Sequence, residues 1–222
     1  IDSAPFVTRI DSAERNRLRA LLGVGPEHLL VGTVSCLKPQ KSPQDFVGVA
    51  SIVCRRIAAA RFVLVGDGAL RPQIEALLQE HGLRERVTLL GWRRDVASLL
   101  KTFDLFLLTS HWEGMPCVLL EARAGRLPIV ATRVGGAAEA IEEPVQGILC
   151  AAGDVQAMAE QVCRILEDEG YRSKLRESAE TFPEEFTIQE TVKQYQSLYT
   201  HLLRAVRPNE GVMGLQTNRS RG

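Results

Sequence analysis

Two glutamates flank the start of an expected helix, and their placement suits a ligand that carries phosphate. Glu113 lies in a loop rich in glycine and proline after the apolar run 105–108, and Glu121 lies about one turn inside the following helix. The first N–H groups of a helix have no partner within the helix, so they attract phosphate. An ionised carboxylate only accepts hydrogen bonds, so one on each side of a pyrophosphate could hold the hydroxyls of a hexose and of a ribose. The alternative is that Glu113 is a solvated loop residue and that Glu121 lies on the helix surface, without a ligand.

The elements that must hold these carboxylates follow an α/β pattern. Short apolar runs alternate with segments of helical periodicity, which predicts a Rossmann-like parallel β-sheet flanked by helices. The runs expected as strands are 29–34, 61–65, 87–90, 105–108, 128–131 and 148–150. The segments expected as helices are 13–22, 43–58, 71–81, 95–101, 117–124, 155–167 and 186–205. Ligands of such sheets bind where the strands end, so the loops that follow the strands are the expected site.

Polar residues at three of the expected helix starts predict N-caps. Ser42 precedes Pro43, which suits the first helical position, and Asp95 and Asp154 precede two further helices. A side-chain oxygen at such a position accepts a hydrogen bond from an N–H group of the first turn. We therefore expect all three side chains to cap the helices that follow them.

The composition bounds the classes of function. The 222 residues are 45% hydrophobic, which is enough for a full core, and 27 basic residues balance 27 acidic ones. No global field therefore favours nucleic acid or an anionic membrane as a partner. Five cysteines lack C-x-x-C spacing, which indicates reduced thiols in the cytoplasm rather than a metal site, and the apolar runs are only as long as strands. Peripheral association with the inner face of a membrane stays open.

The segment around the two glutamates reads S-x-x-E-G-M-P-x-V-x-L-E-A, with seven residues between Glu113 and Glu121. It resembles the paired-glutamate motif of the family-four retaining glycosyltransferases, which have the GT-B fold. The resemblance extends from Ile1 to about Leu203, and its motifs occur in the family's order. It implies that the chain is the C-terminal half of a GT-B fold, with residues 11–205 forming the domain that binds a nucleoside diphosphate sugar.

The resemblance also implies roles for the residues of this motif. A hexosyl unit would pass from the donor to a hydroxyl of a glycan, a lipid or a small molecule with its configuration retained. Glu113 would hold sugar hydroxyls near the anomeric centre, and Glu121 would bind the ribose. The backbone between them would meet sugar and phosphate through Gly114, Met115, Pro116, Cys117 and Val118. No metal ion and no cofactor is implied.

The loop after the first strand aligns with the family pattern Gly-Arg-Leu, three variable residues, then Lys-Gly. Lys41 matches the lysine of that pattern, and a cation there would stabilise the charge of the leaving diphosphate. Cys36 stands where the pattern has arginine, and a thiol cannot replace a guanidinium. Either Lys38 supplies the second positive charge in place of the missing arginine, or this chain binds diphosphate more weakly than the family does. For either lysine the alternative is a solvated surface charge.

Two further loops match the family in order. Gly66 and Gly68 form a Gly-Asp-Gly turn that lets a ligand or another backbone approach closely. Without a third glycine this is no dinucleotide fingerprint. Trp92 and Arg93 lie in the next loop, which borders the nucleotide base in the resembling enzymes. Trp92 could line that pocket or pack against the edge of the sheet.

The double glycine of Gly135 and Gly136 follows the strand expected at 128–131. It resembles the family's loop before a short helix at the cleft, although such pairs are also common in plain turns. We expect it to close the site. His111 is the only histidine near the motif, and without triad partners it is interpreted as a loop residue.

The two ends of the chain carry separate expectations. Ile1 and Asp2 resemble the end of the linker that joins the two halves of the fold, so 1–10 is expected as a linker remnant whose N-terminal acceptor domain is absent from this chain. The helix expected at 186–205 resembles the last helix of the fold, or is an ordinary packing helix. Residues 206–222 have little apolar content and are expected to be disordered.

Two rival functions remain at this point. One is a sugar-nucleotide epimerase of the same fold, whose acid/base carboxylates and histidines do not map onto this chain. The other is a non-catalytic module that binds a nucleotide sugar. The favoured hypothesis is the donor-binding domain of a glycosyltransferase, with its own N-terminal domain as partner and little turnover as an isolated fragment.

Overall fold

The computed structural model describes residues 1–178 and 182–206, with the side chains of all but the last two. Contacts divide the chain into two compact units, Ile1–Phe182 and Pro183–Gly222, and each is described by itself. The tail expected at 206–222 lies almost wholly outside the described residues.

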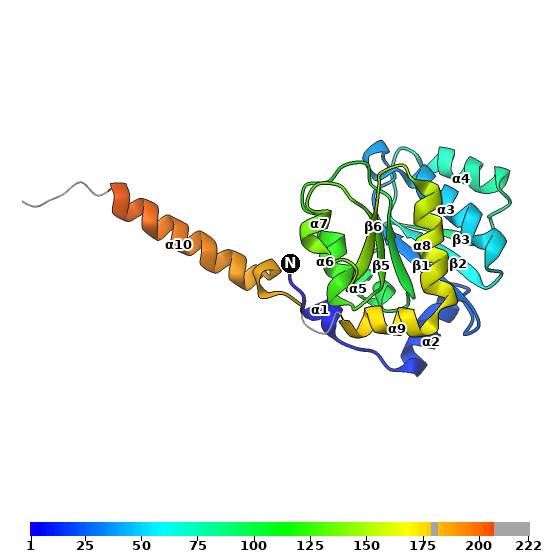
Figure 1. Cartoon of the computed structure of the whole chain (residues 1–222), viewed down its shortest axis with the longest axis horizontal. Helices are drawn as coiled ribbons and strands as arrows, with labels where there is room; N and C mark the ends of the chain where they lie inside the picture. Colours follow the sequence, from blue (N-terminus) through cyan, green and yellow to red (C-terminus); the bar gives the residue numbers. More distant parts are fainter. Residues whose placement is uncertain (179–181, 207–222) are drawn as a thin grey trace, which may run out of the picture. The chain divides into compact units, whose positions relative to one another are not determined.

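The first unit is built on a six-stranded sheet of order β3-β2-β1-β4-β5-β6, in which every pairing of strands is parallel (Figure 1). The strands lie within one residue of the predicted ones at both ends. They are β1 (Leu29–Val34), β2 (Ala60–Val65), β3 (Val87–Gly91), β4 (Leu105–Leu108), β5 (Ile129–Thr132) and β6 (Gly147–Cys150). The order reverses between β1 and β4, which pair through Val31 with Leu105 and Gly32 with Phe106. The predicted α/β fold is therefore confirmed.

Helices cover both faces of this sheet (Figure 1). One face carries α3 (Pro43–Arg56), α4 (Arg71–Glu80) and α8 (Val155–Glu167). The other carries α5 (Val96–Leu100), α6 (Cys117–Ala124) and α7 (Ala137–Ala140). Phe46 and Phe62 meet edge to face at 5.6 Å in the core between α3 and β2. The helices at 117–124 and 155–167 have the predicted ends, and α7 is the short helix expected after the double glycine.

Two helices of the first unit do not appear among the predicted segments. They are α1 (Ala4–Val7) and α9 (Glu169–Ser178). The first is a single turn with Pro5 near its start, and the second is largely polar, with only Leu175 buried, so neither gives a strong apolar period. The helix α2 (Ser12–Leu21) begins one residue before the expected 13–22 and is capped by Asp11, which accepts from the Glu14 N–H.

Only one of the three predicted caps is confirmed. Asp154 accepts from the Ala157 N–H at 2.9 Å. Ser42 has φ +42° at the end of a short 3₁₀ turn, its side chain makes no cap hydrogen bond, and its buried hydroxyl has no partner among the described residues. Asp95 makes no cap because its carboxylate is engaged by the Arg93 guanidinium at 2.8 and 2.6 Å. Those two predictions were wrong.

The second unit contains a 3₁₀ turn at Glu184–Phe186 and helix α10 (Ile188–Val206). The helix expected from 186 begins two residues later because the 3₁₀ turn precedes it. Its apolar side chains recur at helical spacing and are exposed, and they include Ile188, Val192, Tyr195, Leu198, Tyr199 and Leu202.

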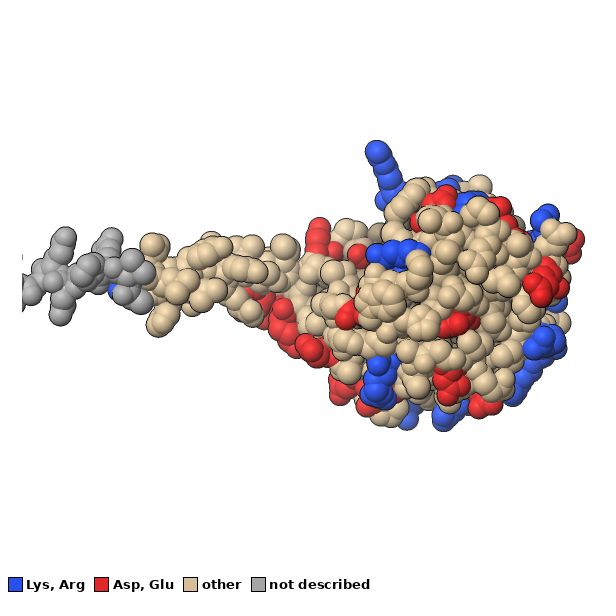
Figure 2. All heavy atoms as spheres, turned by 90° about the horizontal axis from the view of Figure 1, so that it is seen from above, with Lys and Arg blue, Asp and Glu red and all other residues tan. Residues whose placement is uncertain are grey.

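Surface charge and helix length bear on possible partners. On the face shown in Figure 2, basic and acidic side chains intermingle over the sheet domain instead of forming a patch of one sign. Within residues 1–178 and 182–206, no helix is long and apolar enough to cross a membrane.

Asp104 joins four elements at the edge where the strands begin. Its Oδ2 accepts from the Leu30 N–H of β1 at 2.8 Å and from Arg19 of α2 at 3.0 Å. Its Oδ1 accepts from Arg15 of α2 at 2.8 Å and from Arg176 of α9 at 3.2 Å. Burial works against ionisation, but the guanidiniums and the backbone N–H outweigh it and hold the pKa of Asp104 below its ordinary value.

Removing this carboxylate should strongly destabilise the fold. In an Asp104→Ala chain, Arg19 would stay 2% exposed without its counter-charge, and breaking a buried pair in this way costs roughly 3–5 kcal/mol. Urea unfolding followed by circular dichroism measures the loss. The matched control is Asp154→Ala, which removes a helix cap and should cost about 1 kcal/mol. A loss at Asp104 no larger than at Asp154 would contradict this account.

Candidate functional site

The candidate site lies where β1 and β4 end, at the point where the strand order reverses. Loops there diverge to opposite sides of the sheet, which opens a crevice in folds of this kind. The loop after β1 carries Cys36, Lys38 and Lys41, and the loop after β4 carries Glu113. The residues with candidate chemistry therefore come from adjacent central strands.

Glu113 is fixed by two side chains. Ser110 Oγ donates to Glu113 Oε1 at 2.7 Å, and Lys41 Nζ forms an ion pair with the same oxygen. The side chains of Lys41 and Glu113 are only 17% and 7% exposed. The resemblance gives Lys41 and Glu113 separate roles, but in the structure the two side chains contact each other.

Hydrogen bonds to backbone carbonyls join the two loops independently of this pair. Thr109 Oγ1 donates to the carbonyls of Lys41 and Ser42 at 3.1 and 3.0 Å. The His111 N–H donates to the Gln40 carbonyl at 2.8 Å. These bonds hold the cation-bearing loop against the carboxylate-bearing loop, so the distance between the two charges is set by the backbone as well as by their attraction.

The double glycine supports the Glu113 loop from the other side. The Gly136 N–H donates to the Gly114 carbonyl at 2.6 Å. A Cβ at Gly135 would lie 1.8 Å from the Glu113 carbonyl oxygen, and Gly135 has φ +47°. Both glycines are needed for this close approach of two backbones.

A cavity of about 380 Å³ lies between these loops and the start of α6. It gathers most of the residues predicted from the sequence, together with Cys36 and four residues that the sequence analysis did not single out. The predicted residues in its lining are Lys41, Gly66, Trp92, Arg93, Glu113, Met115, Pro116, Cys117, Val118 and Glu121. The lining also contains Cys36, Ser35, Val34, Val65 and Val96. The structure therefore places both glutamates and the lysine in one space.

Five predicted residues are absent from this lining. Gly114, Gly135 and Gly136 act behind it, through the backbone contacts described above. Gly68 lies against the Leu37 backbone, where a Cβ would be 2.5 Å from the carbonyl oxygen. Of the two possibilities that the sequence left open, close approach of a ligand or of another backbone, Gly68 therefore serves the second. Lys38 is exposed and does not reach the lining.

Trp92 and Arg93 form one rim of the cavity. The Trp92 side chain is 72% exposed, so it does not pack under the sheet edge. The charge of Arg93 is shared with Asp95. An exposed aromatic ring at the mouth of a cavity is suited to stack on a planar ligand group.

Glu121 faces the cavity from the first turns of α6. It is half-buried, and this burial raises the pKa of its carboxyl above the ordinary value. Cys117 and Val118 begin the same helix, so their N–H groups lie at its unsatisfied end. Amides of the kind that can bind phosphate and a carboxylate that accepts hydrogen bonds therefore line the same cavity.

The sequence analysis missed the support of Glu113 by Ser110. The i, i+3 spacing of Ser110 and Glu113 in a loop was a signal for such a contact. It also missed a neighbour of His111, whose Nε2 lies 3.4 Å from Asp45 Oδ2. His111 is otherwise a loop residue as predicted, and neither it nor any other histidine lines the cavity among the described residues. Nor does the described chain contain a cluster of three or more side chains suited to a metal ion.

Replacing Gly135 by alanine should displace the Glu113 loop. The new Cβ cannot coexist with the Glu113 carbonyl at 1.8 Å, so the indole signal of the neighbouring Trp112 should shift in NMR spectra. The matched control is Gly153→Ala, because Gly153 also has positive φ, at +80°, but nothing lies within 4 Å of its Cβ position. The control carries only backbone strain of about 1 kcal/mol. A Trp112 signal unmoved by Gly135→Ala would show that the loop is held otherwise.

Comparison with known proteins places this geometry in a family. A family model described as glycosyl transferases group 1 matches residues 14–182. The chain is 33% identical over 192 residues to the N-acetyl-alpha-D-glucosaminyl L-malate synthase of Bacillus anthracis, covering 86% of this chain and 50% of that protein. It is 29% identical over 203 residues to the Escherichia coli UDP-Gal:alpha-D-GlcNAc-diphosphoundecaprenol alpha-1,3-galactosyltransferase, covering 90% and 51%. The chain thus spans about half the length of the curated relatives it matches.

Solved structures agree with this assignment. Anabaena Alr3699/HepE in complex with UDP-glucose superposes with a TM-score of 0.83 at 25% identity, covering 90% of this chain and 56% of that one. The C-terminal domain of the group 1 protein LpcC from Francisella tularensis has the same fold, with a TM-score of 0.72 at 20% identity, covering 81% of this chain and 94% of that domain. The chain therefore belongs to the group 1 glycosyltransferases and forms the C-terminal domain of their GT-B fold.

Proposed function

We propose that this domain binds a nucleoside diphosphate hexose in the cavity between β1, β4 and α6. The observation that carries the proposal is the gathering of Glu113, Lys41 and Glu121 in one cavity of about 380 Å³, beside the first amides of α6. Cavities of this size hold small molecules, and helix N-termini bind phosphate.

Relatives support the choice of nucleotide. The Anabaena protein binds UDP and UDP-glucose, and the name of the E. coli relative states UDP-galactose as donor. Uridine diphosphate is therefore the first nucleotide to test, ahead of GDP and ADP. In this arrangement the base stacks near Trp92 at the rim, and the ribose hydroxyls donate to the Glu121 carboxylate.

Charge sets the orientation of the donor. Lys41 and the Cys117 and Val118 amides face the diphosphate, while Glu113 accepts hydrogen bonds from hydroxyls of the sugar. Lys41 already pairs with Glu113, so the ammonium neutralises carboxylate and phosphate in turn, without a metal ion. Its flexible stem allows this shift.

Cys36 bears on the strength of binding. It lines the cavity where the family pattern has arginine. Lys41 and Arg93 are the cations in the lining formed by described residues, and Arg93 is engaged by Asp95. Most of the diphosphate charge would therefore be met by one lysine and by the helix, which favours modest affinity.

Transfer of the sugar to an acceptor requires the complete protein. We propose that the complete enzyme transfers the hexosyl unit with retention of configuration to a hydroxyl of a glycan, lipid or small molecule carried by an N-terminal domain. The five free cysteines support a cytoplasmic location for the enzyme. We include attachment of the enzyme to the inner face of a membrane in this proposal.

Removal of Glu121 tests the donor assignment. Isothermal titration of the chain with UDP-glucose in EDTA should give binding that Glu121→Ala weakens about tenfold, because hydrogen bonds to a charged group contribute roughly 1.5–3 kcal/mol. Glu80→Ala serves as control, since Glu80 is an exposed glutamate at the end of α4. Equal affinity of Glu121→Ala and the unaltered chain would refute the assignment of Glu121 to the ribose.

The raised pKa of Glu121 predicts a pH dependence. Its carboxyl takes up a proton at a pH above the ordinary glutamate value of about 4.3, and a protonated carboxyl is a poorer acceptor. UDP-glucose affinity should therefore fall as the pH is lowered from 7 to about 5. Glu121→Gln has no charge to lose, so it should bind more weakly at pH 7 and lack this slope. The same slope in both proteins would assign the titration to another group.

A further inference from the structure

The loops that carry Lys41 and Glu113 are joined by more contacts than their ion pair. Gln40 precedes Lys41, and its Nε2 donates to the carbonyl of Trp112, which precedes Glu113, at 2.9 Å. The Gln40 carbonyl in turn accepts from the His111 N–H at 2.8 Å. The residues next to the lysine and the glutamate therefore hold each other, so the position of the charged pair depends on contacts beside the cavity.

His111 extends these contacts to helix α3. Its Nε2 lies 3.4 Å from Oδ2 of Asp45, a residue in the first turn of α3. The Asp45 side chain is 18% exposed, and its Oδ2 is buried with no hydrogen-bond partner among the described residues. A buried carboxylate oxygen without a donor is unfavourable, so Asp45 gains from a cation at this point.

The charged groups on the segments that meet here leave His111 as the partner of Asp45. Lys41, from the 3₁₀ turn before α3, and Glu113, from the same loop as His111, are engaged with each other. The first turn of a helix favours a negative charge such as that of Asp45. An imidazole is positive only when protonated, and side chains of this type change charge between about pH 5 and 8. The His111 side chain is 39% exposed, so solvent can deliver the proton that completes the ion pair.

We propose that His111 is a positioning residue of the donor site, whose charged imidazole pairs with Asp45 and holds the Glu113 loop against the Lys41 loop. His111 does not line the cavity, so it acts on a ligand only through Lys41 and Glu113. The inference rests on the proposed donor function and adds control of that site by protonation. When the imidazole is neutral, the loops are held by their hydrogen bonds and by the Lys41–Glu113 pair alone.

NMR on the ligand-free chain tests the ion pair. The backbone amide signals of Gln40 and Lys41, on the loop opposite His111, should move as the pH is lowered from about 8 to about 5.5. This movement should be largely lost in Asp45→Asn, which has no charge to pair, and in His111→Lys, which stays positive over this range. The matched control is His81→Ala, since His81 is an exposed histidine at the end of α4, and the movement should remain. Equal movement in Asp45→Asn and in the unaltered chain would refute the pair.

Isothermal titration with UDP-glucose tests the positioning role. At about pH 6, His111→Ala and Asp45→Asn should each bind about threefold more weakly than the unaltered chain, because a partly exposed ion pair is weak. The double variant should bind no more weakly than either single variant, since both changes remove the same contact. His111→Lys should keep the affinity, which a role of the imidazole in shape alone would not allow, and His81→Ala should be unaffected. All proteins are compared at one pH, so the titration of Glu121 affects each of them equally.

The outcomes distinguish this inference from the proposed function. Equal affinity of His111→Ala and the unaltered chain, or additive losses in the double variant, would overturn the positioning role and leave the donor site standing. Absence of binding by the unaltered chain would overturn the proposed function and the positioning role with it, whereas the NMR titration decides the ion pair by itself.

Discussion

The ion cluster around Asp104 is the interaction that ties α2 and α9 to the central strands β1 and β4. A buried carboxylate without partners would be strongly unfavourable, so the chain must bring Arg15 and Arg19 from α2 and Arg176 from α9 to one point beneath β4. The same carboxylate accepts from the Leu30 N–H of β1, which fixes β1 beside β4. The pairing of these two strands creates the point of reversed strand order, and the candidate site opens at its other end.

At that other end the site depends on balanced rather than surplus charge. Lys41 and Glu113 neutralise each other at low exposure, and Ser110 and the Thr109 bonds hold their loops in place. Under the proposed function, a ligand with a diphosphate would exchange one partner of Lys41 for another instead of meeting an unpaired cation. The ammonium stays paired in both states, while Glu113 keeps the Ser110 hydrogen bond and would need ligand hydroxyls in place of the cation.

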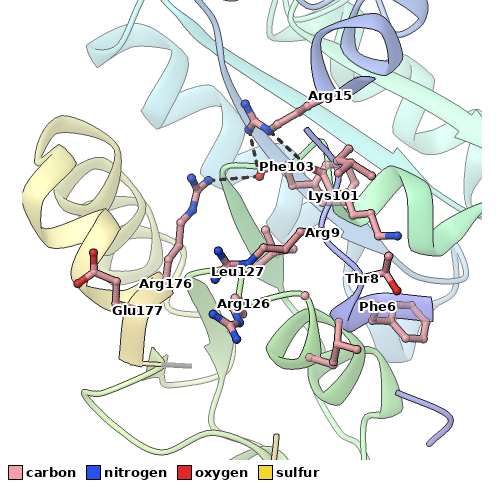
Figure 3. A pocket seen from close by; sticks show the side chains of 14 residues that line it. Phe6, Thr8, Arg9, Arg15, Lys101, Phe103, Arg126, Leu127, Arg176 and Glu177 are labelled. Atoms are coloured by element: carbon pink, nitrogen blue, oxygen red, sulfur yellow. Dashed lines mark hydrogen bonds between the residues drawn. The ribbon is translucent and has the colours of Figure 1, made fainter. Parts of the chain in front are cut away.

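The sequence predicted the fold and the members of the site better than their contacts. Apolar runs located all six strands within one residue, because burial on both faces leaves a continuous signal. Ser42 was misassigned because a positive φ at a non-glycine residue has no local signature, and Asp95 because a cap competes with a nearby guanidinium. The ion cluster around Asp104 escaped prediction entirely. Arg15 of α2 and Arg176 of α9 lie far apart in the chain, and only the fold brings them together at the Phe103 carbonyl (Figure 3).

The two edges of the sheet thus follow opposite electrostatic rules. The edge where the strands end has two carboxylates, Glu113 and Glu121, and Lys41 around one cavity, beside the first amides of α6. Under the proposed function the carboxylates would accept from hydroxyl groups, and the phosphate would be left mainly to those amides. The edge where the strands begin holds its guanidiniums around Asp104 and the Phe103 carbonyl. The ion cluster that joins the strands and the groups proposed to hold the donor are therefore separate sets of residues at opposite ends of β1 and β4.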